Sequence, residues 1–145
     1  RKQTKRNQIM FGSAGYVYVY LIYGIYHCLN FVTDQAEFPS AVLIRALELN
    51  PVTLASIPLK PKEKPERVAA GPGKLCQAMQ IDLALYGAKL ASGQPMWLES
   101  RSADWQLGLD TGKIELVQTT RIGLTQGLDL PWRWYIKGCK AVSKW

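Results

Sequence analysis

Cysteine and histidine are scarce in this sequence. Its 145 residues include three cysteines, Cys28, Cys76 and Cys139, and one histidine, His27. A small, odd number of widely spaced cysteines argues against a disulfide framework and is typical of proteins from a reducing compartment. His27 adjoins Cys28, but neighbours on a strand point to opposite faces and do not make a metal pair. Because no spacing matches a zinc site, we expect no metal.

A long uninterrupted apolar run is also missing. The most apolar stretch, residues 16–32, contains several tyrosines, Gly24 and Asn30, which make it a poor membrane span. Its aromatic and β-branched residues favour strands, and we expect no membrane association. No initiator Met or apolar signal segment opens the chain at Arg1. We therefore expect a piece of a longer or processed polypeptide.

Acidic residues are outnumbered, with 11 Asp and Glu against 18 Lys and Arg, a formal net charge of +7. A basic surface suits a polyanion binder, although many basic proteins bind no polyanion. Basic residues fill four of the first six positions, which fits a phosphate-contacting arm and equally fits a frayed, solvated end. The hydrophobic share of 48% is that of a globular chain with a real core.

The pattern between residues 16 and 32 predicts an aromatic-rich β-hairpin. Rings and aliphatic side chains alternate over residues 16–21, which predicts a strand with tyrosines on one face. Tyr23-Gly24 predicts a tight turn because Gly supplies the backbone freedom for a reversal. Residues 25–32 then return as the second strand, with a tyrosine at the hairpin tip.

Other elements are expected further along the chain. We predict strands at 41–47, 96–99, 114–118 and 132–137, and a short helix at 74–79 after the glycines of 70–73. The glycine spacing excludes a phosphate loop, but the free N–H groups of a helix N-terminus still accept a phosphate. Residues 50–67, rich in Pro and Lys, predict an exposed loop with solvated charges. With neither repeat nor linker, residues 1–145 are expected to form one domain.

A more specific pattern runs along nearly the whole chain. It comprises residues 6–7, 10–11, YVYLIYGIY at 18–26, 28–30, VLIRALE at 42–48, GPGKLCQA at 71–78, 121–123 and WRWYIKG at 132–138. Together, and in this order, they resemble the alkyladenine-type DNA glycosylases, also called 3-methyladenine DNA glycosylases of the mammalian type. One segment alone would be a weak signal.

This resemblance implies a mixed α+β fold, a single domain on a curved antiparallel β-sheet or open barrel, with a protruding β-hairpin and a few short helices. It implies base-excision repair of double-stranded DNA: an alkylated or deaminated purine is flipped out and its N-glycosidic bond is hydrolysed, without metal or organic cofactor. A monomer is expected, located in the bacterial cytoplasm with the nucleoid, or in a eukaryotic nucleus.

Six residues receive roles from the resemblance. Tyr23 fills the gap left by the flipped nucleotide, with Ile25 and Tyr26 beside it on the DNA. The residues of the base pocket are Tyr20, which stacks on the extruded base, and Asn30 and Arg45, which line or support it. Stacking a base on a ring is worth roughly 1–3 kcal/mol, and a cationic alkylated purine adds a cation–π term. Asn30 suits the rejection of guanine by clash with its exocyclic amine.

A simpler interpretation of these residues needs no ligand. Aromatic residues are ordinary strand formers, and a buried Asn is ordinarily a hydrogen-bonded core residue. Without the resemblance this interpretation is preferable for all the tyrosines of residues 16–26 on the strands and for Asn30. With the resemblance it is kept for Tyr16 and Tyr18 and abandoned for Tyr20, Tyr23 and Asn30.

The catalytic residue of the family has no counterpart here. The family's general base is a glutamate, followed closely by a stacking Tyr and a pocket His, and all three fall upstream of Arg1. His27 does not match the pocket His, and Glu48, after Arg45, is interpreted as an ion-pair partner. Ile25 and His27 also differ from the side chains of relatives. We therefore expect an N-terminally incomplete domain that has no catalytic residue of its own and is inactive alone.

Two other functions stay open at this point. One is a non-catalytic DNA- or RNA-binding module of the same fold, and the other is a tRNA-binding β-domain of a translation factor. An acidic motif preceding Arg1 in the full reading frame would favour the glycosylase.

Overall fold

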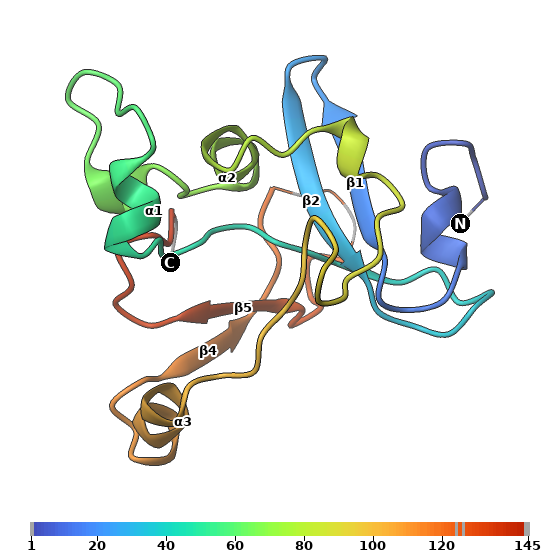
Figure 1. Ribbon diagram of the computed structural model, residues 1–145. Coiled ribbons are helices and arrows are strands. Elements are labelled where there is room, and N and C mark those ends of the chain that lie inside the picture. The colour runs from blue at the N-terminus through green and yellow to red at the C-terminus, as the bar shows by residue number, and fades with distance from the viewer. Residues whose placement is uncertain (1, 124, 126, 144–145) are drawn as a thin grey trace.

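Five strands in two antiparallel sheets and several short helices make up the computed structural model, which describes residues 2–123, 125 and 127–143 (Figure 1). Strands β1 (Val17–Ile22), β2 (Tyr26–Val32) and β3 (Ala41–Leu43) form one sheet in that order. Strands β4 (Leu116–Thr119) and β5 (Arg133–Ile136) form the other, which confirms the strands expected near both places. The expected mixed α+β class is thus confirmed.

The predicted hairpin is present, with its turn at Tyr23-Gly24. Both turn residues have positive φ, 54° and 70°, and Ile25 N donates to Ile22 O across the turn at 3.3 Å. Two positive φ values are the signature of a type I′ turn, whose twist matches that of the flanking strands. The register pairs Tyr18 with Asn30 and Tyr20 with Cys28, so these four side chains share one face.

The core lies against the opposite face of the hairpin. Val17, Val19 and Leu29 are nearly fully buried there against Leu75 and Cys76 of helix α2 (Pro72–Ala78). Alternation on the strands and a helical spacing on α2 bring these apolar residues together, and their burial is the main stabilising contribution. The helix expected at 74–79 is therefore present, and begins two residues earlier.

Helix α2 lies close to the hairpin near its tip. A Cβ atom on Gly73 would lie 2.9 Å from Cδ1 of Tyr26, a distance at which the ring would have to move. Gly73 thus allows the start of α2 to pack directly against the Tyr26 ring of β2. This contact links the helix and the hairpin into one unit.

Several predicted boundaries were wrong. The strand expected at 41–47 ends at Leu43, although Ile44 N still donates to Leu29 O at 2.9 Å. Beyond it, Ala46 forms only an isolated bridge with Ala70. Arg45 therefore lies just after the strand. Residues 96–99 form no strand, because no other strand pairs with their backbone. The Trp97 side chain donates through Nε1 to Glu99 Oε1 at 3.0 Å.

Two helices were missed although their caps are visible in the sequence. Helix α1 (Pro51–Ala55) lies inside the segment predicted as a loop, and Asn50 Oδ1 accepts from Thr53 N at 2.8 Å. Helix α3 (Ala103–Asp110) begins after Ser102, whose Oγ accepts from Trp105 N. Asn-Pro and Ser-x-Asp are ordinary helix starts. The 3₁₀ turns are η1 (Gln8–Phe11), η2 (Pro65–Arg67) and η3 (Leu83–Leu85).

Across the ranges 2–123, 125 and 127–143, no helix has the length and apolar character to cross a bilayer. The same residues bring together no group of three or more potential metal-ligating side chains.

Candidate functional site

Tyr20 lies on the hairpin face turned away from the α2 core. Its ring centroid is 5.3 Å from that of Tyr18, and the Arg6 guanidinium lies 5.5 Å from the Tyr20 centroid. Burial raises the pKa of Tyr20 to about 12, helped by the Cys28 thiol, with which it shares a hydrogen bond. The phenol is therefore protonated at neutral pH, and a cation and a second ring both lie near the Tyr20 ring.

Asn30 is a buried amide with a fixed orientation. It is 6% exposed, and its Nδ2 donates to the carbonyl oxygens of Tyr18 at 3.1 Å and Cys28 at 3.2 Å. Two carbonyl partners settle which end of the amide is the nitrogen, so the side-chain oxygen points away from them. The amide is thus a hydrogen-bonded core group, as the simpler interpretation expects.

We expect Asn30→Ala to lower the free energy of unfolding by about 1–3 kcal/mol, because two buried carbonyls would lose a donor. Urea denaturation measures this loss. Gln118→Ala is the matched control, since that exposed amide also donates to a carbonyl, Pro131 O, but in contact with water. Equal stability losses for the two variants would show that the Asn30 hydrogen bonds contribute no more than surface ones.

Two arginines come to the same place from distant segments. Burial lowers the pKa of Arg45, and the neighbouring Arg133 lowers it further, whereas Cys28 and Tyr20 raise it. Arg133 is 7% exposed, and its guanidinium lies 4.5 Å from the Tyr135 ring centroid. Arg45 is thus close enough to Tyr20, Cys28 and Arg133 for all three to act on its charge, and we call these four residues, from β1, β2, β5 and the segment after β3, the basic cluster.

The described residues bring no carboxylate into the group that surrounds Arg45. No described carboxylate is among the groups that shift the pKa of Arg45. Glu63 forms an ion pair with Lys74 at 2.7 Å, and Glu115 forms one with Lys137 at 2.9 Å.

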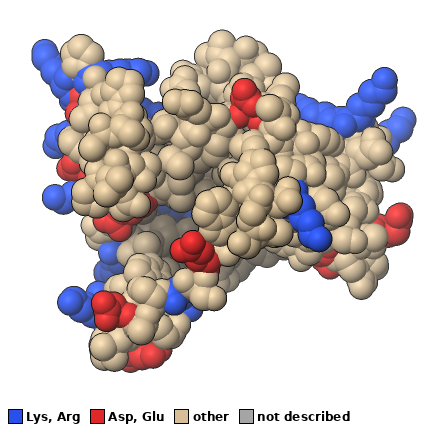
Figure 2. Space-filling view, viewed as in Figure 1, with Lys and Arg blue, Asp and Glu red and all other residues tan. Residues whose placement is uncertain are grey.

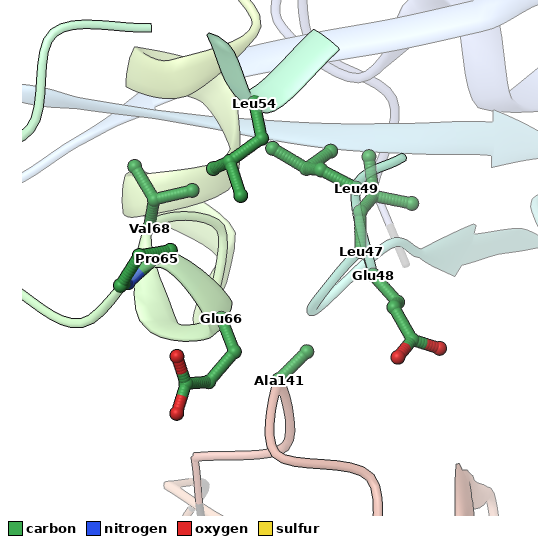
Figure 3. Close-up of a pocket in the computed structure, with 8 residues that line it drawn as sticks. All are labelled: Leu47, Glu48, Leu49, Leu54, Pro65, Glu66, Val68 and Ala141. Atoms are coloured by element: carbon green, nitrogen blue, oxygen red, sulfur yellow. The ribbon is translucent and has the colours of Figure 1, made fainter. Parts of the chain in front are cut away.

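Glu48 lines a separate cavity of about 260 Å³ (Figure 3). Its walls are mostly apolar, and the carboxylates of Glu48 and Glu66 lie on either side of Ala141. Among the described residues no cation lies within ion-pair distance of Glu48, so its interpretation as an ion-pair partner was wrong there. Glu48 follows Arg45 by three residues, but it lines this cavity together with Leu47.

The hairpin tip forms a second group of predicted residues. Tyr23 is 84% exposed, Ile25 is 65% exposed and Tyr26 is 38% exposed. The six residues singled out from the sequence thus form two groups. Tyr23, Ile25 and Tyr26 lie at the hairpin tip. Tyr20 and Asn30 lie on the hairpin face turned away from the α2 core, which we call the inner face, and Arg45 lies just after β3. Sequence analysis did not single out Arg133. The feature that could have revealed it is a charged residue at the start of the otherwise mostly apolar strand β5.

Comparison with known proteins adds a family. The family model described as methylpurine-DNA glycosylase (MPG) matches residues 1–140. A putative 3-methyladenine DNA glycosylase of Trichodesmium erythraeum is 56% identical, over 99% of this chain and 71% of the relative. Proteins with the same description from Synechococcus sp. (strain JA-3-3Ab) and Synechococcus elongatus are 53% and 50% identical, again over 99% of this chain, and over 72% and 64% of their own lengths.

Proposed function

The chain belongs to the methylpurine-DNA glycosylase family, and we propose that it binds duplex DNA and takes part in releasing alkylated purines such as 3-methyladenine. The chemistry is hydrolysis of an N-glycosyl bond in DNA repair. The observation that carries the proposal is that one hairpin has an exposed aromatic residue, Tyr23, at its tip and both a half-buried tyrosine, Tyr20, and a buried amide, Asn30, on its inner face.

Tyr23 is suited to occupy the space of an extruded nucleotide. It projects from a type I′ turn, which holds its backbone in one conformation, and most of its side chain is free of protein contact. Extruding a base costs a few kcal/mol of lost stacking, and a planar ring in the gap recovers part of it. Ile25 and Tyr26 follow on the same tip and add apolar surface for the groove.

The inner face is suited to recognise the damaged base. A neutral Tyr20 ring offers a π face, on which a purine made cationic by alkylation gains a cation–π interaction as well as stacking. Arg6 already occupies such a position at 5.5 Å from the ring centroid, so the ring has one face that attracts cations. Asn30, fixed by two carbonyls, supplies a rigid edge against the exocyclic amine of guanine.

Hydrolysis further requires a group that activates water. We infer that the general base is a carboxylate that the described residues do not bring to Tyr20, and that it would be held beside the basic cluster. Arg45 supports this inference because its half-buried guanidinium favours a neighbouring anion. An oxocarbenium-like transition state also benefits from a nearby carboxylate, as in glycoside hydrolysis. We propose a monofunctional glycosylase, which releases the damaged base and does not cleave the DNA strand.

A non-catalytic lesion-binding module is the second candidate. The observation in its favour is that no described carboxylate is among the groups that shift the pKa of Tyr20 or Arg45. Both candidates require DNA binding, and they differ only in turnover.

Binding to a fluorescent duplex with one ethenoadenine should exceed binding to the undamaged duplex of equal sequence, and both affinities should fall steeply with salt. A protein with six to ten phosphate contacts loses about 10³–10⁵-fold between about 50 and 200 mM salt. Anisotropy titrations at several salt concentrations measure both properties. An affinity that ignores salt, or no binding to either duplex, would refute the proposed function.

A further inference from the structure

Three lysines project from a turn that sequence analysis interpreted as a solvated loop. We call residues 60–64 the lysine turn, after the exposed Lys60, Lys62 and Lys64. The backbone of the turn is closed by Glu63 N, which donates to Lys60 O at 3.0 Å, and Lys62 has a positive φ of 65°. The three lysines are therefore carried by a folded turn with a hydrogen-bonded backbone.

Glu63 fastens the lysine turn to helix α2. Its Oε2 accepts from Lys60 N at 3.4 Å, and its Oε1 accepts from Lys74 Nζ at 2.7 Å. The Glu63 side chain is 12% exposed and that of Lys74 is 48% exposed, so the ion pair joins the turn to α2 at the protein surface. Among the described residues, no carboxylate is within ion-pair distance of Lys60, Lys62 or Lys64. Glu63 thus holds the turn while the three outer lysine charges stay available.

Helix α2 in turn connects the lysine turn to the hairpin. Lys74 contacts the turn, and the adjacent Gly73 packs on Tyr26 close to the hairpin tip. Figure 1 shows the loop between α1 and α2 rising on the same side of the molecule as the hairpin tip, with α2 between them. In Figure 2 lysine and arginine side chains gather at that corner and again near the N-terminus, on the other side of the hairpin.

We propose that the lysine turn is a phosphate-binding element, which contacts the DNA backbone to one side of the base pair that Tyr23 enters. The inference rests on the proposed function. Duplex DNA presents one negative charge per about 1.7 Å of axis, so a protein that inserts a hairpin meets phosphates on both flanks. A preformed turn binds them at a lower ordering cost than a flexible loop. The contacted groups are phosphates, so the contribution is independent of sequence and of damage.

The test compares two single-lysine variants with equal loss of charge. Lys62→Ala removes a lysine of the turn, and Lys113→Ala removes an exposed lysine after α3, at the far end of the molecule (Figure 1). Affinity for a damaged and an undamaged duplex is measured over a range of salt. We expect Lys62→Ala to reduce the slope of log affinity against log salt by about 0.9, equally for both duplexes, and Lys113→Ala to leave it unchanged.

Replacing all three lysines of the turn by Ala should reduce the slope by up to about 2.7, three times the single value. Thermal melting checks that these surface variants remain folded. Identical slopes for the triple variant and the parent would overturn the proposal while leaving the proposed function intact. A parent chain that binds no DNA would instead refute the proposed function.

Glu63→Gln separates a fixed contact from bulk charge. It makes the protein more positive by one charge, so simple attraction predicts tighter binding to DNA. If Glu63 positions the lysine turn, the variant should bind more weakly than the parent, because the turn loosens from α2. A rise in affinity would overturn the fixed-turn contact.

Discussion

Excision of hypoxanthine or ethenoadenine by the 145-residue chain alone should be negligible, although the chain should bind the same duplexes. General-base catalysis contributes roughly 10²–10⁴-fold to a rate, and the described residues bring no carboxylate to Tyr20 and Arg45. Glu63 and Glu115 are held in ion pairs, and Glu48 lines a separate cavity with Glu66. The binding surfaces and the basic cluster are therefore expected to be present without turnover.

Single-turnover kinetics with enzyme in excess measure this rate. The comparison is with a chain extended at its N-terminus by the acidic segment that the resemblance implies, which should recover the activity. A glutamate-to-glutamine change within that segment is the control, and it should return the rate to that of the 145-residue chain. Rapid excision by the 145-residue chain itself would mean that one of its own carboxylates is the base, and Glu48→Gln and Glu66→Gln would then be the first variants to assay.

Tyr23→Ala should weaken binding to a duplex with a flipped abasic-site analogue by roughly 1–3 kcal/mol, or about 5- to 150-fold, the value of one aromatic stacking contact. The ring is 84% exposed, so its loss removes few contacts within the protein. The change in affinity is therefore attributable to the DNA complex. Fluorescence anisotropy with the parent and the variant measures the difference.

Two controls separate the ring from general effects. Tyr23→Phe keeps the plane and loses the hydroxyl, and it should bind within a few tenths of a kcal/mol of the parent if stacking is the cause. Val52→Ala truncates another side chain of comparable exposure, 82%, on α1, and should change nothing. An unchanged affinity for Tyr23→Ala would remove Tyr23 from the gap and leave the hairpin tip without its proposed role.

The hairpin could be predicted from the sequence because all of its determinants are local. Alternation of rings and aliphatic side chains sets the two strands, and Tyr23-Gly24 sets the turn, so register and tip follow without knowledge of the remaining chain. Helices α1 and α3 were equally local, since Asn50 and Ser102 cap them, but the Pro- and Lys-rich composition and the short helix lengths concealed the signal.

The basic cluster could be predicted only in part. Tyr20 and Cys28 face each other through the hairpin register, but Arg133 reaches Arg45 from a strand 88 residues later in the chain. That approach depends on how the two sheets pack, which no local pattern encodes. The geometry of the lysine turn could not be predicted either. It depends on the ion pair between Glu63 and Lys74 of α2, which the local run of alternating Pro and Lys does not indicate.

The backbone of Tyr23 has a consequence for attempts to make this protein more stable. Left-handed backbone costs a bulky residue about 1–2 kcal/mol, and Asn-Gly is the pair that a type I′ turn prefers. A design protocol that scores stability alone would therefore rank Tyr23 among the first residues to replace, and Asn as its substitute. Stabilising changes of this kind trade activity for a firmer fold where a residue is kept for its ligand. Position 23 should be held fixed in any such redesign, and the gain in stability should be sought at positions remote from the hairpin.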